Sequence, residues 1–473
     1  MQPEIHASIA GRLVIVGFGS IGQGVLPLIL RHVALDRDRI TIFTAHDRGR
    51  DVAQSWGIAD FRLQPLTRET YRQQLEPLLR QGGFLLNLSY DVSSVALIEL
   101  CHRLDVPYLD SCIEPWAGGH FDPELTPTER SNYGQRELAL AVGRKDWRHR
   151  PTCVVTHGVN PGLISHFTKR ALSSMASDLG LVSAPQAARE DWARLAMILG
   201  VRVIHIAERD FQQSAQQKQP GEFVNTWSTE AFVGEGSQPA ELGWGTHEKV
   251  LPAGGRRHPI GSQAAIYLER PGVSVRVRSW TPLQGPYHGF LITHAESISI
   301  ADYLTLREGA TVVYRPTVHY AYHPCDDAVM SIFEYCGKGY QLPARSRLLR
   351  EEVICGTDEL GILLCGNAKG VYWYGSRLTI EEARALAPCN NATTLQTAAG
   401  VLGGLIWTIE NPGRGVVEPD AMDHERIMRI AEPYLGTMVG AWDAWTPLRG
   451  REQLFPEDVD RDDPWQFKNI LVT

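Results

Sequence analysis

The stretch VIVGFGSIGQG, Val14–Gly24, contains three glycines with the spacing G-x-G-x-x-G. It begins with an apolar run typical of a buried strand and leads into Val25–Val33, which is typical of a helix. In this context the first glycine permits a tight turn, the second lets the backbone approach a pyrophosphate, and the third allows close helix–strand packing. The helix N-terminus then attracts the phosphate charge. The residues predicted to bind pyrophosphate are Gly17, Gly19 and Gly22, and Ser20 and Ile21 between them are predicted to bind the cofactor.

The first 155 residues continue this strand–helix alternation. Short Val-, Ile- and Leu-rich runs such as Arg39–Ala45 and Phe84–Tyr90 alternate with helix-like segments such as Tyr71–Arg80 and Val95–Leu104. Short buried strands separated by helices are typical of right-handed βαβ units. We therefore predict an α/β protein whose residues 1–155 form a Rossmann domain with a doubly wound parallel sheet.

From residue 156 to residue 378 the pattern changes. Tyr, Trp, Thr and Val alternate in runs such as Val273–Trp280, His288–Leu306 and Gly370–Leu378, which favours a mostly antiparallel sheet. This region is predicted to be a second, α+β domain. Residues 379–473 become helical again, with Thr379 placed to cap a helix, and we expect this tail to complete the first domain.

Composition narrows the class of protein. At about 150 residues per domain, 473 residues suggest two or three domains. The net charge of −8 argues against a nucleic-acid partner and is compatible with a cationic small molecule. The eight cysteines form no CxxC pair, which indicates reduced thiols in a cytoplasmic protein. We find no signal peptide, and the apolar segment Ala398–Trp407 is too short to span a bilayer.

The choice between NAD and NADP depends on the end of the second strand. An acid there would hold the ribose hydroxyls of NAD, but this strand ends in Thr44. Asp47 lies beyond it, and Arg48 and Arg50 could instead receive the 2′-phosphate of NADP. We favour NAD and leave the alternative open.

Polar residues follow the other predicted strands of the first domain, where ligands bind in open α/β sheets. Asn160, which precedes Pro161, could also be a helix N-cap with proline at the first helical position. The strand-end candidates are Asn87, Ser89, Asp91, Asp110, Glu114 and Asn160.

Several carboxylates lie among apolar or aromatic residues of the second region. In NTWSTEAFVGEG, Asn225–Gly236, Trp227 is accompanied by Glu230 and Glu235. An aromatic face with nearby carboxylates suits a cation, although a half-buried tryptophan in a strand with two solvated glutamates is the alternative. The other acids of this kind are Glu208 and, beside His294, Glu296. Such acids are costly to bury unless they are paired, and an ammonium ligand would pair with them.

Other chemistries have weaker support. Arg276 and Arg278 could clamp a substrate carboxylate, but their alternation favours one solvated strand face. His294 lacks the downstream cysteines of zinc deaminases, and His319 and His323 lack the glutamate of a zincin. We predict no metal.

Longer segments resemble the bacterial homospermidine synthases, a family similar in fold to saccharopine-dehydrogenase-like oxidoreductases. The resemblance runs from about Gly11 to the C-terminus. The segments that carry it are VGFGSIGQG, NLSYDVSS, EPWAGG, NPG, HIAERD, FVNTWSTEAF, QPAELGWGTHE, GFLITHAESISIADY, YRPTVHYAYHP, YWYGSRL and FPEDVDRDDPWQF.

The resemblance implies a homodimeric enzyme that joins two putrescines into homospermidine and releases ammonia, with NAD taking and returning a hydride. It places Asn160, Glu208, Trp227, Glu235, His294 and Glu296 around the diamine, with Asp91, Glu114 and Asp358 as further substrate residues. Gly17, Gly19, Ser20, Ile21, Gly22, Thr44, Asn87, Ser89 and Asn160 would bind the cofactor. Thr44 departs from the expected acid. Spermidine could replace one putrescine.

Two other functions stay open from the sequence. One is a net NAD(P)-dependent amine or imine dehydrogenase of the saccharopine or carboxynorspermidine type, which would need an arginine clamp for a carboxylate. The other is a non-catalytic nucleotide-binding sensor.

Overall fold

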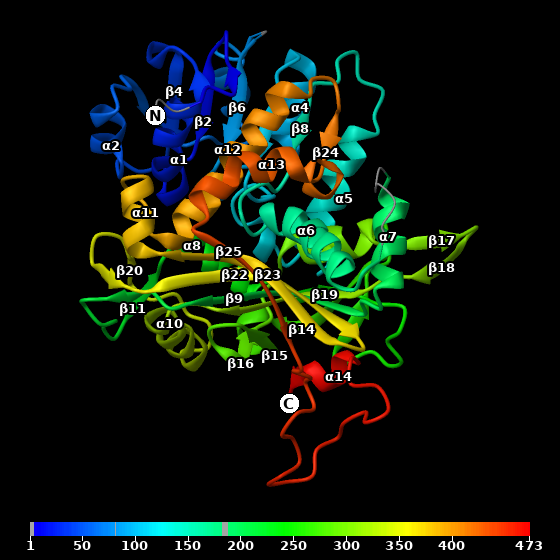
Figure 1. Cartoon of the computed structure of the whole chain (residues 1–473). Coiled ribbons are helices and arrows are strands. Elements are labelled where there is room, and N and C mark those ends of the chain that lie inside the picture. Colours follow the sequence, from blue (N-terminus) through cyan, green and yellow to red (C-terminus); the bar gives the residue numbers. More distant parts are fainter. Residues whose placement is uncertain (1–3, 81, 182–187) are drawn as a thin grey trace. The chain divides into compact units, whose positions relative to one another are not determined.

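The computed structural model describes residues 4–80, 82–181 and 188–473 (Figure 1). The chain forms two compact units. Unit 1 contains Met1–Leu163, Thr226–Ala231 and Ile380–Gly436, and unit 2 contains Ile164–Asn225, Phe232–Thr379 and Thr437–Thr473. The segment Thr226–Ala231 thus belongs to unit 1 although both of its neighbours in the chain belong to unit 2.

Unit 1 contains a seven-stranded parallel sheet in the order β24-β8-β7-β6-β2-β4-β5. The order reverses at β2, as in a doubly wound fold. The bounds are β2 Leu13–Val16, β4 Ile40–Thr44, β5 Asp60–Leu63, β6 Phe84–Asn87, β7 Tyr108–Asp110, β8 Cys153–Val154 and β24 Val416–Val417. The predicted Rossmann fold is confirmed. Strand β24 was not predicted, because a strand of two residues leaves no recognisable pattern.

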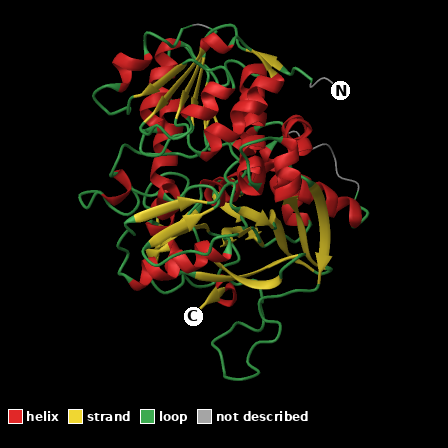
Figure 2. Ribbon diagram, turned by 90° about the vertical axis from the view of Figure 1, so that its left-hand side faces the viewer, coloured by secondary structure: helices red, strands yellow, loops and turns green. Residues whose placement is uncertain are grey.

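Helices cover both faces of this sheet, as can be followed in Figure 2. Helices α1 and α12 pack together, and α4 and α5 contribute to a separate apolar core with the strands. The bounds are α1 Ser20–His32, α2 Arg50–Ser55, α3 Tyr71–Leu75, α4 Ser94–Leu104, α5 Asn132–Gly143, α11 Ile380–Leu386, α12 Ala392–Glu410 and α13 His424–Ala431. Helix α12 is long and apolar enough to cross a membrane, but 89% of its apolar window is buried inside the protein, as in a core helix.

Unit 2 contains an eleven-stranded mixed sheet. Its central strand β9 pairs in parallel with β19 and antiparallel with β22, and the outer pairs are antiparallel. The bounds are β9 Val203–Asp210, β12 Pro239–Gly243, β13 Gly255–Arg257, β14 Ala265–Pro271, β15 Arg276–Thr281, β16 Gly285–Phe290, β19 Thr317–His323, β22 Thr357–Asn367, β23 Gly370–Thr379, β25 Thr437–Asp443 and β26 Leu471–Val472. The expected second α+β domain is confirmed in kind.

Further elements of unit 2 lie around this sheet. They are α6 Leu163–Asp178, α7 Arg189–Ile198, α8 Glu230–Ser237, α9 Ala295–Tyr303, α10 Asp326–Gly337 and α14 Phe467–Ile470, with the small strands β10 Gln213–Ser214, β11 Glu222–Asn225, β17 Leu306–Glu308, β18 Thr311–Tyr314, β20 Arg345–Leu348 and β21 Val353–Cys355. Helices α6 and α8 begin in segments of unit 1.

Two segments for which a strand was expected or left open contain helices instead. Trp227 precedes α8, whose start is capped by Ser228 Oγ accepting from the Ala231 amide. Glu296 lies in the first turn of α9, not in a strand. Residues Ala295–Ala301 of α9 are all buried, so this helix has no polar face and lacks the 3.6-residue periodicity that identifies a helix in sequence.

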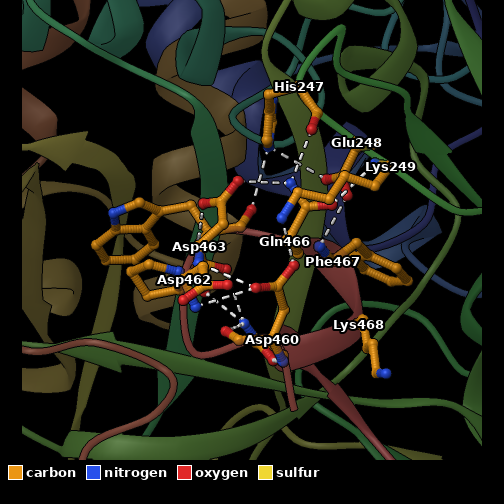
Figure 3. A network of polar contacts seen from close by, with 12 residues as sticks. His247, Glu248, Lys249, Asp460, Asp462, Asp463, Gln466, Phe467 and Lys468 are labelled. Carbon is orange, nitrogen blue, oxygen red and sulfur yellow. Dashed lines mark hydrogen bonds and ion pairs between the residues drawn. The ribbon is translucent and has the colours of Figure 1, made fainter.

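The C-terminal tail also differs from expectation, because Thr437–Thr473 belongs to unit 2. Strand β26 pairs with β15, and the polar network of Figure 3 holds the preceding turn. Glu248 accepts from the Phe467 amide at 2.9 Å, and Gln466 donates to the His247 carbonyl at 2.7 Å. Lys249 pairs with Asp460 at 2.6 Å. These contacts join residues about two hundred positions apart in the sequence, which a local pattern does not encode.

On the face of the β9–β19 pair that lines the aromatic core of unit 2, two histidines lie opposite each other. His205 and His319 are register partners with ring centroids 4.2 Å apart, and neither is exposed. Burial lowers the pKa of His319 to about 3 and, together with His319, lowers that of His205 well below its usual value. Both rings are therefore neutral in the folded protein.

We predict that His319→Phe makes the protein less sensitive to acid. Below pH 6.5, which is about the pKa of histidine in an unfolded chain, His319 binds a proton in the unfolded state but stays neutral in the folded state. The free energy of unfolding therefore falls with falling pH, by up to ~1.4 kcal/mol per pH unit for that histidine. The urea midpoint, followed by tryptophan fluorescence at pH 7, 6 and 5, should fall less steeply in the variant. Exposed His46, changed to Gln, is the control. Equal slopes in His319→Phe and the parent protein would contradict the prediction.

Candidate active site

The glycine loop of unit 1 has the geometry that a pyrophosphate requires. Gly17 has φ +86°, and a Cβ there would lie 2.5 Å from the Leu88 carbonyl oxygen. A Cβ on Gly22 would lie 2.9 Å from the Gly17 carbonyl oxygen, whereas one on Gly19 would meet nothing within 4 Å. Gly17 and Gly22 are thus needed for packing, and Gly19 leaves open space in front of α1. This division of roles fits a dinucleotide.

The ribose end contains the residues that left the nucleotide choice open. Thr44 Oγ donates to the His46 carbonyl at 3.0 Å. Asp47 pairs with Arg50 at 2.5 Å, and Arg48 lies 3.5 Å from Glu230. Each arginine therefore has a carboxylate beside it. Glu230 is exposed, so it does not join the buried acids with which the sequence analysis grouped it.

The strand-end residues form a buried hydrogen-bond chain. Ser89 donates to Asn87 Oδ1 at 2.5 Å, Asn87 Nδ2 donates to the Tyr108 hydroxyl at 3.2 Å, and that hydroxyl donates to Asp110 at 2.7 Å. The Thr156 amide donates to the other Asp110 oxygen at 2.6 Å. Burial raises the pKa of Asp110 to about 7, although these hydrogen bonds lower it. These hydrogen bonds join β6 to the turn that leads to Asn160.

Asn160 lies in the turn after β8 and is half-buried. Helix α6 begins at Leu163, so the alternative role of Asn160 as N-cap, with Pro161 as the first helical residue, is wrong. The turn is shaped by the close approach of α12, because a Cβ on Gly400 would lie 1.9 Å from the Gly158 oxygen. The position of Asn160 therefore depends on the packing of α12 against this turn.

Asp91 and Glu114 lie near a buried histidine of unit 1. His120 Nε2 is 3.4 Å from Glu114 Oε2, and both side chains are buried. Burial lowers the pKa of His120, but the hydrogen bond and charge of Glu114 outweigh this and raise it. Burial raises the pKa of Asp91, and His120 partly offsets the effect.

Trp227 is half-buried and belongs to the short segment of unit 1. Its carbonyl oxygen accepts a hydrogen bond from Ser20 Oγ at the start of α1. The preceding carbonyl, of Thr226, accepts from Asn391 Nδ2 at 2.6 Å. The backbone of Trp227 is thus attached to the helix that starts at the glycine loop.

The acids of unit 2 form a cluster around His294. His294 Nε2 donates to Glu235 at 3.1 Å and Nδ1 donates to Glu296 at 3.3 Å. Burial lowers the pKa of His294, but the two carboxylates outweigh burial and raise it to about 10. His294 is therefore an imidazolium at neutral pH.

Two tyrosines, which the sequence analysis did not single out, extend this cluster. The Tyr320 hydroxyl donates to Glu208, and the rings of His294 and Tyr320 have centroids 4.5 Å apart. Tyr320 stacks on Tyr322, and the charges of Glu208 and Asp358 add to burial in raising the pKa of Tyr322 well above its usual value. The pattern Tyr-x-Tyr in β19 could have indicated that both tyrosines belong to the cluster, because alternate residues of a strand point to the same face.

The cluster has an excess of acidic groups. The four carboxyl groups of Glu208, Glu235, Glu296 and Asp358 accompany one imidazolium, and all except that of Glu235 are at most 3% exposed. Within the described part of the chain, Glu296 Oε2 is buried and has no hydrogen-bond partner. Such an acceptor calls for an additional donor.

The arginines considered as a carboxylate clamp have other contacts. The Arg276 guanidinium lies over the Phe290 ring, 3.5 Å from its centroid. Arg278 lies 3.6 Å from Glu457. Across residues 4–80, 82–181 and 188–473, no group of three or more His, Cys, Asp or Glu side chains is arranged to hold a metal ion.

We predict that His294 stays protonated in the wild-type protein from pH 6 to 9, and that Glu296→Gln lowers its pKa, since one of its two carboxylates is lost. The measurement is a ring-nitrogen NMR titration of protein with ¹⁵N-labelled histidine, with His294→Gln used to assign the resonance. Exposed Glu269, changed to Gln, should leave the titration unchanged. A neutral His294 at pH 7.5 in the wild-type protein would contradict the prediction.

The chain is similar over nearly its whole length to several homospermidine synthases. The chain is 51% identical over 472 residues to homospermidine synthase of Blastochloris viridis, covering 99% of this chain and 98% of the relative. It is 49% identical over 475 residues to homospermidine synthase of Mesorhizobium japonicum, again covering 99% and 98%. The crystal structure of homospermidine synthase from Legionella pneumophila in complex with NAD superposes with a TM-score of 0.92 at 47% identity, covering 98% of both chains.

Two domain families also match. Residues 13–154 match the saccharopine dehydrogenase NADP binding domain, and residues 158–441 match the saccharopine dehydrogenase C-terminal domain. The similarity therefore extends over both the nucleotide-binding region and the region of the acidic cluster.

Proposed function

The chain belongs to the homospermidine synthase family, and we propose that it joins two putrescine molecules into homospermidine with release of ammonia. The observation that supports this most directly is the buried acidic cluster of unit 2, in which Glu296 Oε2 lacks a hydrogen-bond partner within the described residues. A diammonium ligand would supply both the missing charge and the missing donors. A carboxylate-bearing substrate would need an arginine, and Arg276 and Arg278 have other contacts.

NAD, which is bound in the crystal structure of the Legionella relative, would supply the redox chemistry as a hydride acceptor and donor. The amine-bearing carbon of the first putrescine could then be oxidised and the new imine reduced without net oxidation. The residues proposed to hold it in unit 1 are Gly17, Gly19, Ser20, Ile21, Gly22, Thr44, Asn87, Ser89 and Asn160. The pairing of Arg50 with Asp47 supports NAD over NADP, because that guanidinium already has a carboxylate partner.

The cluster residues would divide the work on the diamine. We assign Glu208, Glu235 and Asp358 to binding of ammonium groups, and the imidazolium of His294, fixed by Glu296, to proton transfer. Attack by the second amine needs that amine neutral, so a nearby carboxylate must accept its proton first. Asn160 would bind near the reacting amine, and Asp91 and Glu114 are proposed as further sites of attraction for the incoming cation.

Trp227 would stabilise the cationic carbon–nitrogen group through the face of its ring. A positive charge develops at that group when hydride leaves, so the interaction strengthens along the reaction. A group that binds the transition state better than the ground state raises kcat.

We further propose a homodimer in the cytoplasm. The family resemblance supports the dimer. All eight cysteines are free in the structure, which supports a reducing compartment. Spermidine, as a longer amine with the same terminal group, is a candidate substitute for one putrescine.

The reaction itself provides the first test. Putrescine and NAD, incubated with the protein and analysed by chromatography, should give homospermidine and ammonia in equal amounts without accumulation of NADH. Omission of NAD is the control. NADH formed in step with product would instead indicate a net dehydrogenase, and tight NAD binding without turnover of any amine would indicate a nucleotide sensor.

The role of Trp227 is tested by three variants. Trp227→Phe keeps a ring with a weaker quadrupole and should retain part of the activity, whereas Trp227→Ala should cost about 1–3 kcal/mol of transition-state stabilisation, or roughly one to two decades in kcat/KM. Trp227→Leu restores apolar volume without a π system. If the leucine and phenylalanine variants were equally active, with both folded and binding NAD, Trp227 would be a packing residue.

A further inference from the structure

Asn391 is a buried asparagine that the proposed reaction does not use. It lies directly before α12, and 3% of its surface is exposed. Its Oδ1 accepts from the Thr394 amide at 2.8 Å, and its own amide donates to Thr394 Oγ at 2.9 Å. These two bonds form a capping box, which stabilises the start of the helix. They leave Nδ2 for another acceptor.

That acceptor is the carbonyl of Thr226, at 2.6 Å. Thr226 is fully buried, and the next carbonyl, of Trp227, accepts from Ser20 Oγ. The two carbonyls belong to the two peptide groups that flank the Trp227 Cα. Since peptide groups are planar, holding both of them limits φ and ψ of Trp227. The direction in which the indole leaves the backbone is limited as a result.

The topology explains why such a constraint is needed. The six residues Thr226–Ala231 belong to unit 1, whereas the stretches before and after them in the sequence belong to unit 2. A short segment without a sheet partner must have its backbone polar groups satisfied by other means. The donors here come from the first residue of α1 and from the residue that caps α12, two helices that pack against each other. Both are elements of the nucleotide-binding unit.

We propose that Asn391 is a positioning residue that, with Ser20, aims the ring of Trp227 at the reacting cation. This rests on the proposed role of Trp227. In this role Asn391 acts through the backbone on either side of the tryptophan. A serine at the glycine loop that binds the same segment also links the geometry of Trp227 to the nucleotide site.

The chain offers variants that separate capping from positioning. Asn391→Asp and Asn391→Ser both keep a good N-cap, but neither can donate to the Thr226 carbonyl as Nδ2 does. Thr394→Val is the matched control, because it removes the other half of the capping box and leaves the contact with Thr226 intact. If the buried aspartate of Asn391→Asp prevents folding, the uncharged variant Asn391→Ser still tests the proposal.

The expected result for the Asn391 variants is a fall in kcat/KM for putrescine of roughly five- to tenfold, with NAD affinity changed less than about twofold. Thr394→Val should lower the melting temperature without this loss of activity. In a Trp227→Phe background, Asn391→Asp should have a smaller effect than in the wild type, because part of what it positions has been removed. A full, unreduced effect in that background would overturn the proposal, as would unchanged activity.

A second readout needs no activity and so separates this proposal from the function proposed for Trp227. With 5-fluorotryptophan in place of the twelve tryptophans, the ¹⁹F resonance absent from Trp227→Phe is that of Trp227. Asn391→Asp and Asn391→Ser should shift or broaden it, while the resonance of fully buried Trp373, assigned with Trp373→Phe, stays in place. An unmoved Trp227 resonance overturns the positioning role. A moved resonance, with equal activity of Trp227→Leu and Trp227→Phe, rejects the cation role and keeps the positioning.

Discussion

The acidic cluster of unit 2 depends on one electrostatic constraint, which is that several carboxyl groups are buried together with a single imidazolium. A buried carboxylate loses its hydration, and this loss costs more than most single interactions return. His294 meets part of the need by taking a proton and donating from both ring nitrogens, to Glu235 and Glu296. The remaining acidic groups, Glu208 and Asp358, lie beside tyrosines whose hydroxyls burial keeps protonated. The site is thus preorganised for a ligand that brings positive charge.

The same strands have different chemistry on their two faces. His205 and Glu208, three residues apart on β9, lie on opposite faces because side chains alternate along a strand. One face joins an aromatic core in which histidines are neutral, and the other bears the acidic cluster. Burial acts on His205, His319 and His294 alike, but of these three described histidines His294 is the one with carboxylates within hydrogen-bonding distance, so its pKa rises while those of the other two fall. Burial keeps His205 and His319 neutral, whereas at His294 the two carboxylates outweigh burial.

Much of the fold could be predicted from the pattern of the sequence, for a physical reason. In unit 1, strands buried on both faces are short runs of Val, Ile and Leu. The glycine loop can be recognised from its spacing, and a Cβ at Gly17 would collide with the backbone of Leu88 and Ser89, just after β6. The predictions of secondary structure were wrong where complete burial removes the hydrophobic periodicity of an element or where the element is very short. Helix α9 is buried on all sides, β24 has two residues, and the C-terminal tail is held by side-chain contacts to residues about two hundred positions earlier.

By itself, the sequence determined the dinucleotide-binding half, the change to a mostly antiparallel pattern, and the residue types on which the proposed cation site rests. Glycine spacing, strand alternation and acids among apolar residues are local properties. Only the tertiary structure decided which of these residues meet. It brings Glu235 of α8 and Glu296 of α9 to the two nitrogens of one histidine, and leaves Glu230, five residues from Glu235, exposed beside Arg48. It also joins the backbone of Trp227 to Ser20 and Asn391, about two hundred residues away on one side and more than one hundred and sixty on the other. Hydrogen bonds and ion pairs act over a few ångströms of space whatever the distance along the chain, so they follow from the packing of elements and not from their order.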